Sequence, residues 1–261
     1  MTLHSTCLPS GRGLTIWLPP GYQEQPASPY PLLVLHDNQN LFDPDRAYVR
    51  GEHWRAGETA GALIAAGRIP PLVLAGIDHA GDDRMREFTP TPGGRRGAGQ
   101  ARRYAALVID EVLPFLRRTY PVRTDEAGTG LGGSSLGGLV TLATAAAHPG
   151  VFGRLLVMSP SVWWDGRVIL HTLRRHPLDP FTRIWIDIGR REGPRALADA
   201  RRLRDVIGRS ATLRYVEDLE GDHSERSWAR RLPRALEFLF PPLPESVTLA
   251  ASAILAPANE R

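Results

Sequence analysis

The feature that most restricts the fold of this 261-residue chain is a regular alternation of short aliphatic runs with longer segments of helical spacing. Runs such as 32–36 (LLVLH) and 154–158 (RLLVM) are almost continuously apolar, which is typical of strands covered on both faces. Amphipathic segments stand between them, as in proteins built from strand-helix-strand units. The sequence therefore predicts an α/β fold with a mostly parallel central sheet and helices on both faces.

The expected elements follow from this spacing and from Gly and Pro signals. Strands are predicted at 14–18, 32–36, 72–78, 127–132, 154–158, 184–188 and 213–216, and helices at 56–66, 100–119, 135–147, 194–207 and 224–240. Pro114 is expected to bend the helix over 100–119. Residues 84–103, rich in Gly, Pro and Arg, are expected to form a long loop that runs into that helix. Residues 1–240 are assigned to one domain and residues 241–261 to a peripheral tail.

Composition narrows the class of protein. No apolar run approaches the roughly 20 residues needed to cross a bilayer. The 32 basic residues are all arginines, interspersed with acids at a net charge of +4, which argues against a nucleic-acid-binding protein. The single cysteine, Cys7, excludes an intramolecular disulfide and a multi-cysteine metal site. The start, MTLHSTCLPSGRG, lacks the pattern of a secretory signal, so a cytoplasmic location without membrane association is expected.

The stretch GGSSLGGLV contains the strongest local motif. A nucleophile elbow, G-x-S-x-G, needs small residues two positions before and after the serine, because the chain turns sharply there from a strand into a helix. Ser135 has Gly133 and Gly137 at these positions, whereas the frame centred on Ser134 has Leu136 where the second glycine is required. A strand is predicted before the motif and a helix after it. Ser135 is therefore the candidate nucleophile, and a glycine-rich connection without catalytic role is the alternative.

A serine hydroxyl becomes a useful nucleophile only when a base accepts its proton, and in proteins with this elbow an acid and then a histidine follow in the chain. Four histidines follow Ser135. His148 stands in the His-Pro-Gly stop of the elbow helix, and His171 and His176 lie in an arginine-rich helical insertion. Only His223 is expected in a loop between a strand and the last helix. His223 is therefore the candidate base.

The acid is less sharply indicated. Glu192 follows the strand predicted at 184–188 and falls at its carboxyl end, where the active-site groups of open α/β sheets collect. Asp187, inside that strand, is the rival, and Asp222, beside the histidine, is a third candidate. A serine-histidine dyad without a firm acid also stays open.

An oxyanion hole needs two main-chain N–H groups aimed at the developing negative charge. One is expected from the residue after the nucleophile, Leu136, and the other from the turn after an early strand. The polar turn after 32–36 supplies the second candidate, Gln39. The alternative is an ordinary turn whose Asp and Asn side chains cap main-chain groups.

These residues give the chain a family likeness. Six stretches in order carry it: LPPGY at 18–22, LLVLHDNQNLFD at 32–43, REFTP at 86–90, VLPFLRRTYPV at 112–122, GGSSLGGL at 132–139 and SPSVWW at 159–164. The chain resembles, from about residue 14 to 240, the putative-esterase branch of the α/β-hydrolases, which includes esterase D, enterochelin esterases and feruloyl esterases. The resemblance implies an α/β-hydrolase fold, a Ser135–His223–Glu192 triad, and no metal or organic cofactor. Where the family often has Asp-Gly-Gln-Asn in the oxyanion turn, this chain has Asp-Asn-Gln-Asn at 37–40.

The likeness also bears on the substrate. The SPSVWW stretch is most similar to the siderophore esterases of the family, and Trp163 with Trp164 can wall an aromatic acyl group, although core packing is an equal alternative for one of them. Arginines at 84, 86, 95, 96, 102 and 103, with Arg86 as the chosen contact, can present a basic rim to an anionic substrate. A solvated loop is the simpler alternative for these arginines. The short distance in sequence from Ser135 to Glu192 leaves no room for a large lid.

The sequence therefore predicts a serine carboxylic-ester hydrolase that acts on a small-molecule ester through an acyl-enzyme, with siderophore-type or aromatic acyl esters as the expected class. An acyltransferase with the same triad is one alternative, since mycolyltransferases resemble this family. A non-catalytic, hydrolase-like binding protein is the other. The sequence does not indicate an oligomeric state.

Overall fold

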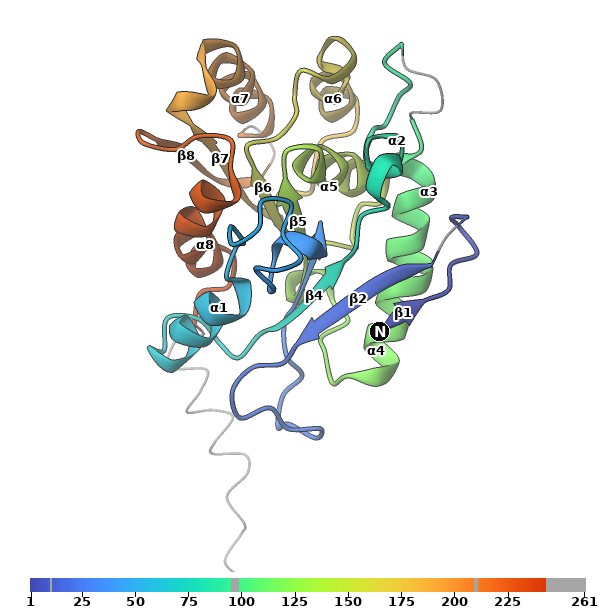
Figure 1. Cartoon of the computed structure of the whole chain (residues 1–261), viewed down its shortest axis with the longest axis vertical. Coiled ribbons are helices and arrows are strands. Elements are labelled where there is room, and N and C mark those ends of the chain that lie inside the picture. Colours follow the sequence, from blue (N-terminus) through green and yellow to red (C-terminus); the bar gives the residue numbers. More distant parts are fainter. Residues whose placement is uncertain (10, 95–98, 209–210, 243–261) are drawn as a thin grey trace, which may run out of the picture.

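A computed structural model describes residues 1–9, 11–94, 99–208 and 211–242. In these residues the chain forms one eight-stranded sheet of order β1-β2-β4-β3-β5-β6-β7-β8 (Figure 1). The strands are β1 (Thr2–Leu3), β2 (Arg12–Trp17), β3 (Leu32–His36), β4 (Val73–Ile77), β5 (Thr129–Ser134), β6 (Arg154–Met158), β7 (Arg183–Gly189) and β8 (Thr212–Asp218). The six strands from β4 to β8 in this order are parallel, and β2 pairs antiparallel with both β1 and β4. The predicted α/β fold is confirmed.

Helices cover both faces of this sheet, as predicted. They are α1 (Ala56–Ala65), α2 (Arg84–Phe88), α3 (Ala101–Ala106), α4 (Leu113–Thr119), α5 (Leu136–Ala147), α6 (Trp164–Arg175), α7 (Pro194–Ile207) and α8 (Glu225–Leu239). Because side chains alternate along a strand, β3 sends Leu32 and Val34 to a core shared with α3, α5 and α7, and Leu33 and Leu35 to a core shared with α1 and α8. Helices α1 and α8 lie side by side on this second face (Figure 1).

The helix predicted over 100–119 is continuous but not uniform. Its middle, Leu107–Val112, is π-helical (η3) and separates α3 from α4. Pro114 follows this stretch, at the second position of α4, and has no N–H group to donate to the preceding turn. The predicted irregularity at Pro114 therefore takes the form of a widened turn directly before it.

The prediction of an unbroken loop over residues 84–103 is wrong at its start, because Arg84–Phe88 forms α2. Contacts distant in sequence hold this short helix: Phe88 is buried in the core, and Glu87 forms a buried ion pair with Arg12 of β2. Residues 95–98 of the predicted loop, and the predicted tail from residue 243 onward, lie outside the described residues.

The segment between β6 and β7 contains a single helix, α6, in agreement with the expected lack of a large lid. Among the described helices, none combines the length and the apolar character needed to cross a membrane. The parallel strands β4, β3, β5, β6 and β7 all have their carboxyl ends at the same edge of the sheet. The fold therefore brings the ends of β3, β5, β6 and β7 to one place.

Candidate active site

Ser135 occupies a strained turn between β5 and α5. Its backbone angles are φ 57° and ψ −120°, a region that residues other than glycine seldom adopt. The turn is attached to the end of β6 by two hydrogen bonds: the Ser135 N–H donates to the Met158 carbonyl at 3.0 Å, and the Ser161 N–H donates to the Ser135 carbonyl at 3.0 Å. A Cβ atom on Gly133 would lie 3.1 Å from the ring of His36, which explains the need for glycine there. The geometry is that of a nucleophile elbow.

His223 lies between the other two candidate residues. Its Nε2 is 3.0 Å from Ser135 Oγ, and its Nδ1 is 2.6 Å from Glu192 Oε2. The carboxylate can only accept, so Nδ1 carries the proton and the unprotonated Nε2 accepts from the serine hydroxyl. The Trp228 ring and the imidazole pack in a T-shaped arrangement, with ring centres 5.0 Å apart. The structure thus brings together the three residues that the sequence selected.

Glu192 lies in a short 3₁₀ turn, η5 (Arg190–Glu192), directly after β7. Its Oε1 accepts the Gly189 N–H at 2.8 Å and the Ser159 hydroxyl at 2.6 Å. Burial by itself would raise the pKa of Glu192, but the hydrogen bonds from His223, Ser159 and Gly189 outweigh it, so the pKa lies below its usual value. Glu192 is therefore ionised at neutral pH and can balance an imidazolium.

The two rival acids make their contacts elsewhere. Asp187 is fully buried, accepts the indole N–H of Trp185 at 2.7 Å and faces Arg231 Nε at 3.1 Å. Burial raises the pKa of Asp187 to about 6, although the charge of Arg231 acts against it. Asp222 accepts the hydroxyls of two serines on the α8 side of its loop. The geometry therefore favours Glu192 over both as the partner of His223.

The two candidate oxyanion donors are both main-chain N–H groups at the start of a helical turn. Leu136 is the first residue of α5, so its N–H has no acceptor inside the helix. Gln39 lies in the 3₁₀ turn η1 (Asn38–Asn40), whose first internal hydrogen bond runs from the Asn40 N–H to the Asp37 carbonyl. The N–H of Gln39 precedes that bond and likewise has no acceptor within its turn. Its side chain exchanges two hydrogen bonds of 3.1 Å with the main chain of His79.

A cleft of about 430 Å³ opens beside Ser135 and His223. The η1 turn contributes Asp37 and Asn40 to its lining, and Gln39 is not part of it. Arg84 also lines it and donates hydrogen bonds to both carboxylate oxygens of Asp37, at 2.6 and 2.8 Å. Within the described residues, no group of His, Cys, Asp and Glu side chains is arranged to hold a metal ion.

The predicted substrate contacts lie outside this lining. Arg86 is exposed on α2 and pairs with Asp83 at 2.8 Å. Trp163 is 56% exposed and stacks obliquely on Trp164, whose ring is buried and whose Nε1 donates to the Thr91 carbonyl at 3.0 Å. The core alternative therefore holds for Trp164, and Trp163 is the ring left facing solvent.

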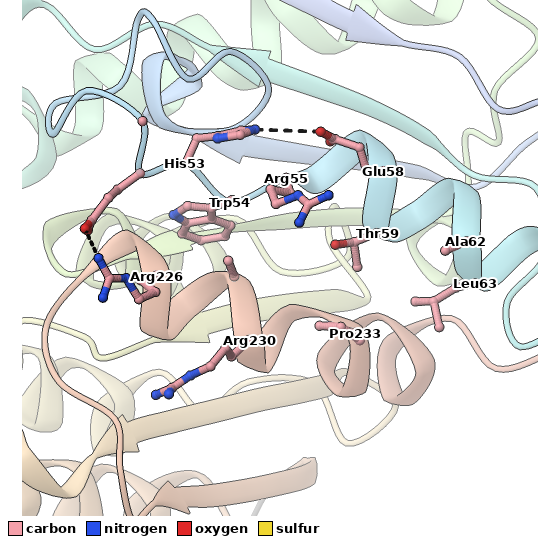
Figure 2. Close-up of a pocket in the computed structure, with 13 residues that line it drawn as sticks. His53, Trp54, Arg55, Glu58, Thr59, Ala62, Leu63, Arg226, Arg230 and Pro233 are labelled. Carbon is pink, nitrogen blue, oxygen red and sulfur yellow. Dashed lines mark hydrogen bonds and ion pairs between the residues drawn. The ribbon is translucent and has the colours of Figure 1, made fainter.

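A second cleft, of about 630 Å³, lies between α1 and α8 (Figure 2). Trp54 and Arg55 are among its lining residues, as are Glu52 and Arg226, which form an ion pair. None of Ser135, His223 and Glu192 lines it. Although it is larger than the cleft at Ser135, the groups suited to acyl chemistry are not in it.

Comparison with known proteins identifies the family of this chain. The model of the family described as Putative esterase matches residues 5–239. The chain belongs to the Putative esterase family. The match includes all the elements that carry the candidate triad.

Individual relatives match different shares of this chain. The uncharacterized protein YbbA of Bacillus subtilis is 26% identical over 189 residues, which span 70% of this chain and 69% of YbbA. The iron(III) salmochelin esterase of Escherichia coli is 32% identical over 140 residues, which span 53% of this chain and 30% of that protein. Among solved structures, an IroE-like serine hydrolase from Shewanella oneidensis superposes with a TM-score of 0.73 at 20% identity, covering 98% of this chain and 85% of the other. The last likeness establishes a shared α/β-hydrolase-like fold.

Several residues at this esterase-family site were not selected from the sequence. Ser161 places its Oγ 3.3 Å from Ser135 Oγ, and Ser159 bonds to Glu192. Both belong to the SPSVWW stretch, of which the sequence indicates only the tryptophans as candidate site residues. Their position directly after β6 is the signal that indicates them, because the ends of neighbouring parallel strands meet at one edge.

Proposed function

We propose that this chain is a serine carboxylic-ester hydrolase that works through an acyl-enzyme on a Ser135–His223–Glu192 triad. The observation that carries the proposal is the position of His223, with Nε2 at 3.0 Å from Ser135 Oγ and Nδ1 at 2.6 Å from Glu192 Oε2. A histidine that acts as a general base needs a hydroxyl proton within reach of one ring nitrogen and a carboxylate that orients the ring through the other, and His223 has both.

In the first half-reaction, Ser135 Oγ bonds to the ester carbonyl carbon while its proton passes to His223 Nε2. The carbonyl oxygen becomes negative and is held by the N–H groups of Leu136 and Gln39. Collapse of this intermediate breaks the bond to the alcohol oxygen, which takes the proton from His223. Water then repeats the sequence on the acyl-enzyme and releases the acid. Glu192 stays ionised throughout and stabilises the imidazolium.

Siderophore-type and aromatic acyl esters are the proposed substrate class. The open site supports this choice, since the His223 side chain is 46% exposed and only α6 stands between β6 and β7. An accessible site of this kind suits bulky, soluble esters better than long acyl chains. The relative named as an iron(III) salmochelin esterase points the same way. Trp163, which faces solvent, and Arg86, which is exposed on α2, are the proposed contacts of an aromatic or anionic part of the substrate outside the lining of the Ser135 cleft.

A substrate panel tests this function. Short nitrophenyl esters, feruloyl esters and a catecholate trilactone are offered to the wild type and to Ser135→Ala. The proposal predicts hydrolysis of at least one of the three by the wild type and loss of at least a thousandfold in Ser135→Ala. Added alcohol acceptors separate hydrolysis from acyl transfer, because a transferase converts most of the acyl-enzyme to a new ester. Equal turnover by the wild type and Ser135→Ala would contradict the proposal.

A further inference from the structure

Ser159 has a backbone conformation that is unusual for a residue before proline. It follows β6 directly, precedes Pro160 and has a φ of 41°. Residues before proline normally adopt extended conformations with negative φ, and a positive φ at a residue with a Cβ atom is strained. Such a backbone persists only where surrounding contacts hold it. Its N–H donates to the Asp187 carbonyl at 2.9 Å, which fastens Ser159 to β7.

The hydroxyl of Ser159 has three partners, and their chemistry fixes the direction of every hydrogen bond. Trp228 Nε1 lies 2.9 Å and Arg231 Nη2 lies 3.0 Å from Ser159 Oγ. Indole and guanidinium groups can only donate, so they occupy both acceptor positions of the hydroxyl. Its one proton must then point to the third partner, Glu192 Oε1, at 2.6 Å. The Ser159 hydroxyl is therefore the donor in its hydrogen bond to Glu192.

The donors behind Ser159 are themselves held in place. Trp228 and Arg231 are three residues apart on α8 and face the same side of the helix. Arg231 is 5% exposed and lies between Asp187 Oδ1, 3.1 Å from its Nε, and Asp218 Oδ2, 3.7 Å from its Nη1. A buried guanidinium needs such counter-charges. Asp187, the acid that the sequence left as a rival to Glu192, thus anchors the arginine that bonds to Ser159.

We propose that Ser159 is a positioning residue of the reaction: it holds Glu192 Oε1 from behind, so that Oε2 is aimed at His223 Nδ1, and Trp228 and the Arg231–Asp187 pair hold Ser159 for this purpose. The inference rests on the proposed function. Ser159 does not line the cleft and acts through Glu192. Its removal should therefore lower kcat and leave KM almost unchanged, because Oε1 would keep only the Gly189 N–H.

The test is a double-mutant cycle between Ser159→Ala and Glu192→Ala, with kcat and KM measured on a nitrophenyl ester. Loss of one hydrogen bond to a charged group predicts a fall in kcat of about ten- to a hundredfold for Ser159→Ala, with KM within twofold. In the Glu192→Ala background, Ser159→Ala should have no further effect, because the group through which it acts is gone. Thr129→Val is the matched control, since it removes another buried hydroxyl that donates a hydrogen bond, at the start of β5, and should keep wild-type kcat.

Ser159→Gly guards against a folding defect, because glycine accepts the positive φ. It should match the kcat of Ser159→Ala, which attributes the effect to the hydroxyl rather than to backbone strain. A proton NMR signal from His223 Nδ1–H, which reports the bond to Glu192, should move upfield in both variants.

Three results would overturn the inference: wild-type kcat in Ser159→Gly, an undiminished effect of Ser159→Ala in the Glu192→Ala background, or an unmoved His223 signal. If the proposed function itself is wrong, Ser135→Ala retains the activity of the wild type, independently of the results for the Ser159 variants. That result would overturn both the proposed function and the role of Ser159.

Discussion

Arg84 of α2 and Asp37 of the oxyanion turn form a two-point ion pair at the mouth of the Ser135 cleft, with Nε and Nη2 at 2.6 and 2.8 Å from the two carboxylate oxygens. Asp37 has a φ of 57° and a side chain only 7% exposed. The pair therefore ties α2 to the strained residue that leads into η1. Together with the burial of Phe88 and the Glu87–Arg12 ion pair, this contact holds residues 84–88 as a helix in a stretch whose composition suggests a loop.

Arg84→Ala should destabilise the protein by about 2–4 kcal/mol, because it leaves the Asp37 carboxylate buried without a partner. Urea unfolding monitored by tryptophan fluorescence measures the change. Arg50→Ala is the matched control: Arg50 and Asp45 are both highly exposed, so loss of that pair should cost less than about 0.5 kcal/mol. Equal unfolding midpoints for Arg84→Ala and Arg50→Ala would disprove the structural role of the Arg84–Asp37 pair.

His36 gives the stability a pH dependence of known sign. Burial lowers the pKa of His36 from 6.5 to about 4 and outweighs the charge of Asp37, which raises it; the charge of Arg84 adds a smaller lowering effect. Between these pH values the unfolded chain binds a proton that the native state does not. Stability is therefore fully present above pH 6.5 and is lost as pH falls toward 4, by about 3 kcal/mol for this group.

His36→Gln should remove this component. The free energy of unfolding is measured in urea at several pH values from 7 to 4 for both proteins, and the difference between them isolates His36 from other titrating groups such as Asp187. The wild type should lose more stability than the variant over this range. Parallel curves would show that His36 is not buried in its neutral form.

The identity of the acid can be tested by comparing two carboxylates near His223. Glu192→Gln keeps the volume but removes the charge, and should lower kcat on the order of a hundred- to ten-thousandfold. Asp222→Asn alters a residue adjacent in sequence whose carboxylate bonds to Ser224 and Ser227, and should keep kcat within threefold of the wild type. The opposite ranking would assign the acid to Asp222.

The two adjacent tryptophans should separate binding from stability. Trp163→Ala should raise KM for a feruloyl ester several-fold and leave KM for an acetyl ester unchanged, because its ring is exposed and available to an aromatic group. Trp164→Ala should instead cost about 3–5 kcal/mol of stability, since that ring is buried. KM values on both esters and urea midpoints for both variants check this. An unchanged feruloyl KM in Trp163→Ala would remove Trp163 from the substrate site.

The parts of this structure that can be predicted from the sequence are those determined by residues close together in the chain. Helix α7 was predicted from Pro194 to Ile207 and has these bounds, because a proline at its start and Gly208 after its end are physical start and stop signals. Strands β3 and β6 were also correct at both ends, as mostly apolar runs that begin after a proline or glycine and end before an aspartate or serine. Ser135 was selected between two adjacent serines because only its frame supplies glycines at both required positions.

What the sequence missed depends on contacts between distant segments. The role of Ser159 arises from β6, β7 and α8 meeting at one point, and no pattern within SPSVWW distinguishes it from Ser161. In the same way, Arg84 and Arg86 are alike in sequence, and only the fold directs Arg84 to Asp37 and Arg86 to Asp83. The sequence alone therefore does not indicate that Arg84 is the one of the two that lines the Ser135 cleft.

The measurement that tests the central claim most directly is intact-mass analysis after reaction with a fluorophosphonate, which labels a serine only when a base activates it. The account predicts one adduct per wild-type chain, none on Ser135→Ala and strongly slowed labelling of His223→Ala, with all three proteins folded by circular dichroism. A folded wild type that takes up no label, or a Ser135→Ala variant that labels as fast as the wild type, would contradict an activated nucleophile at Ser135.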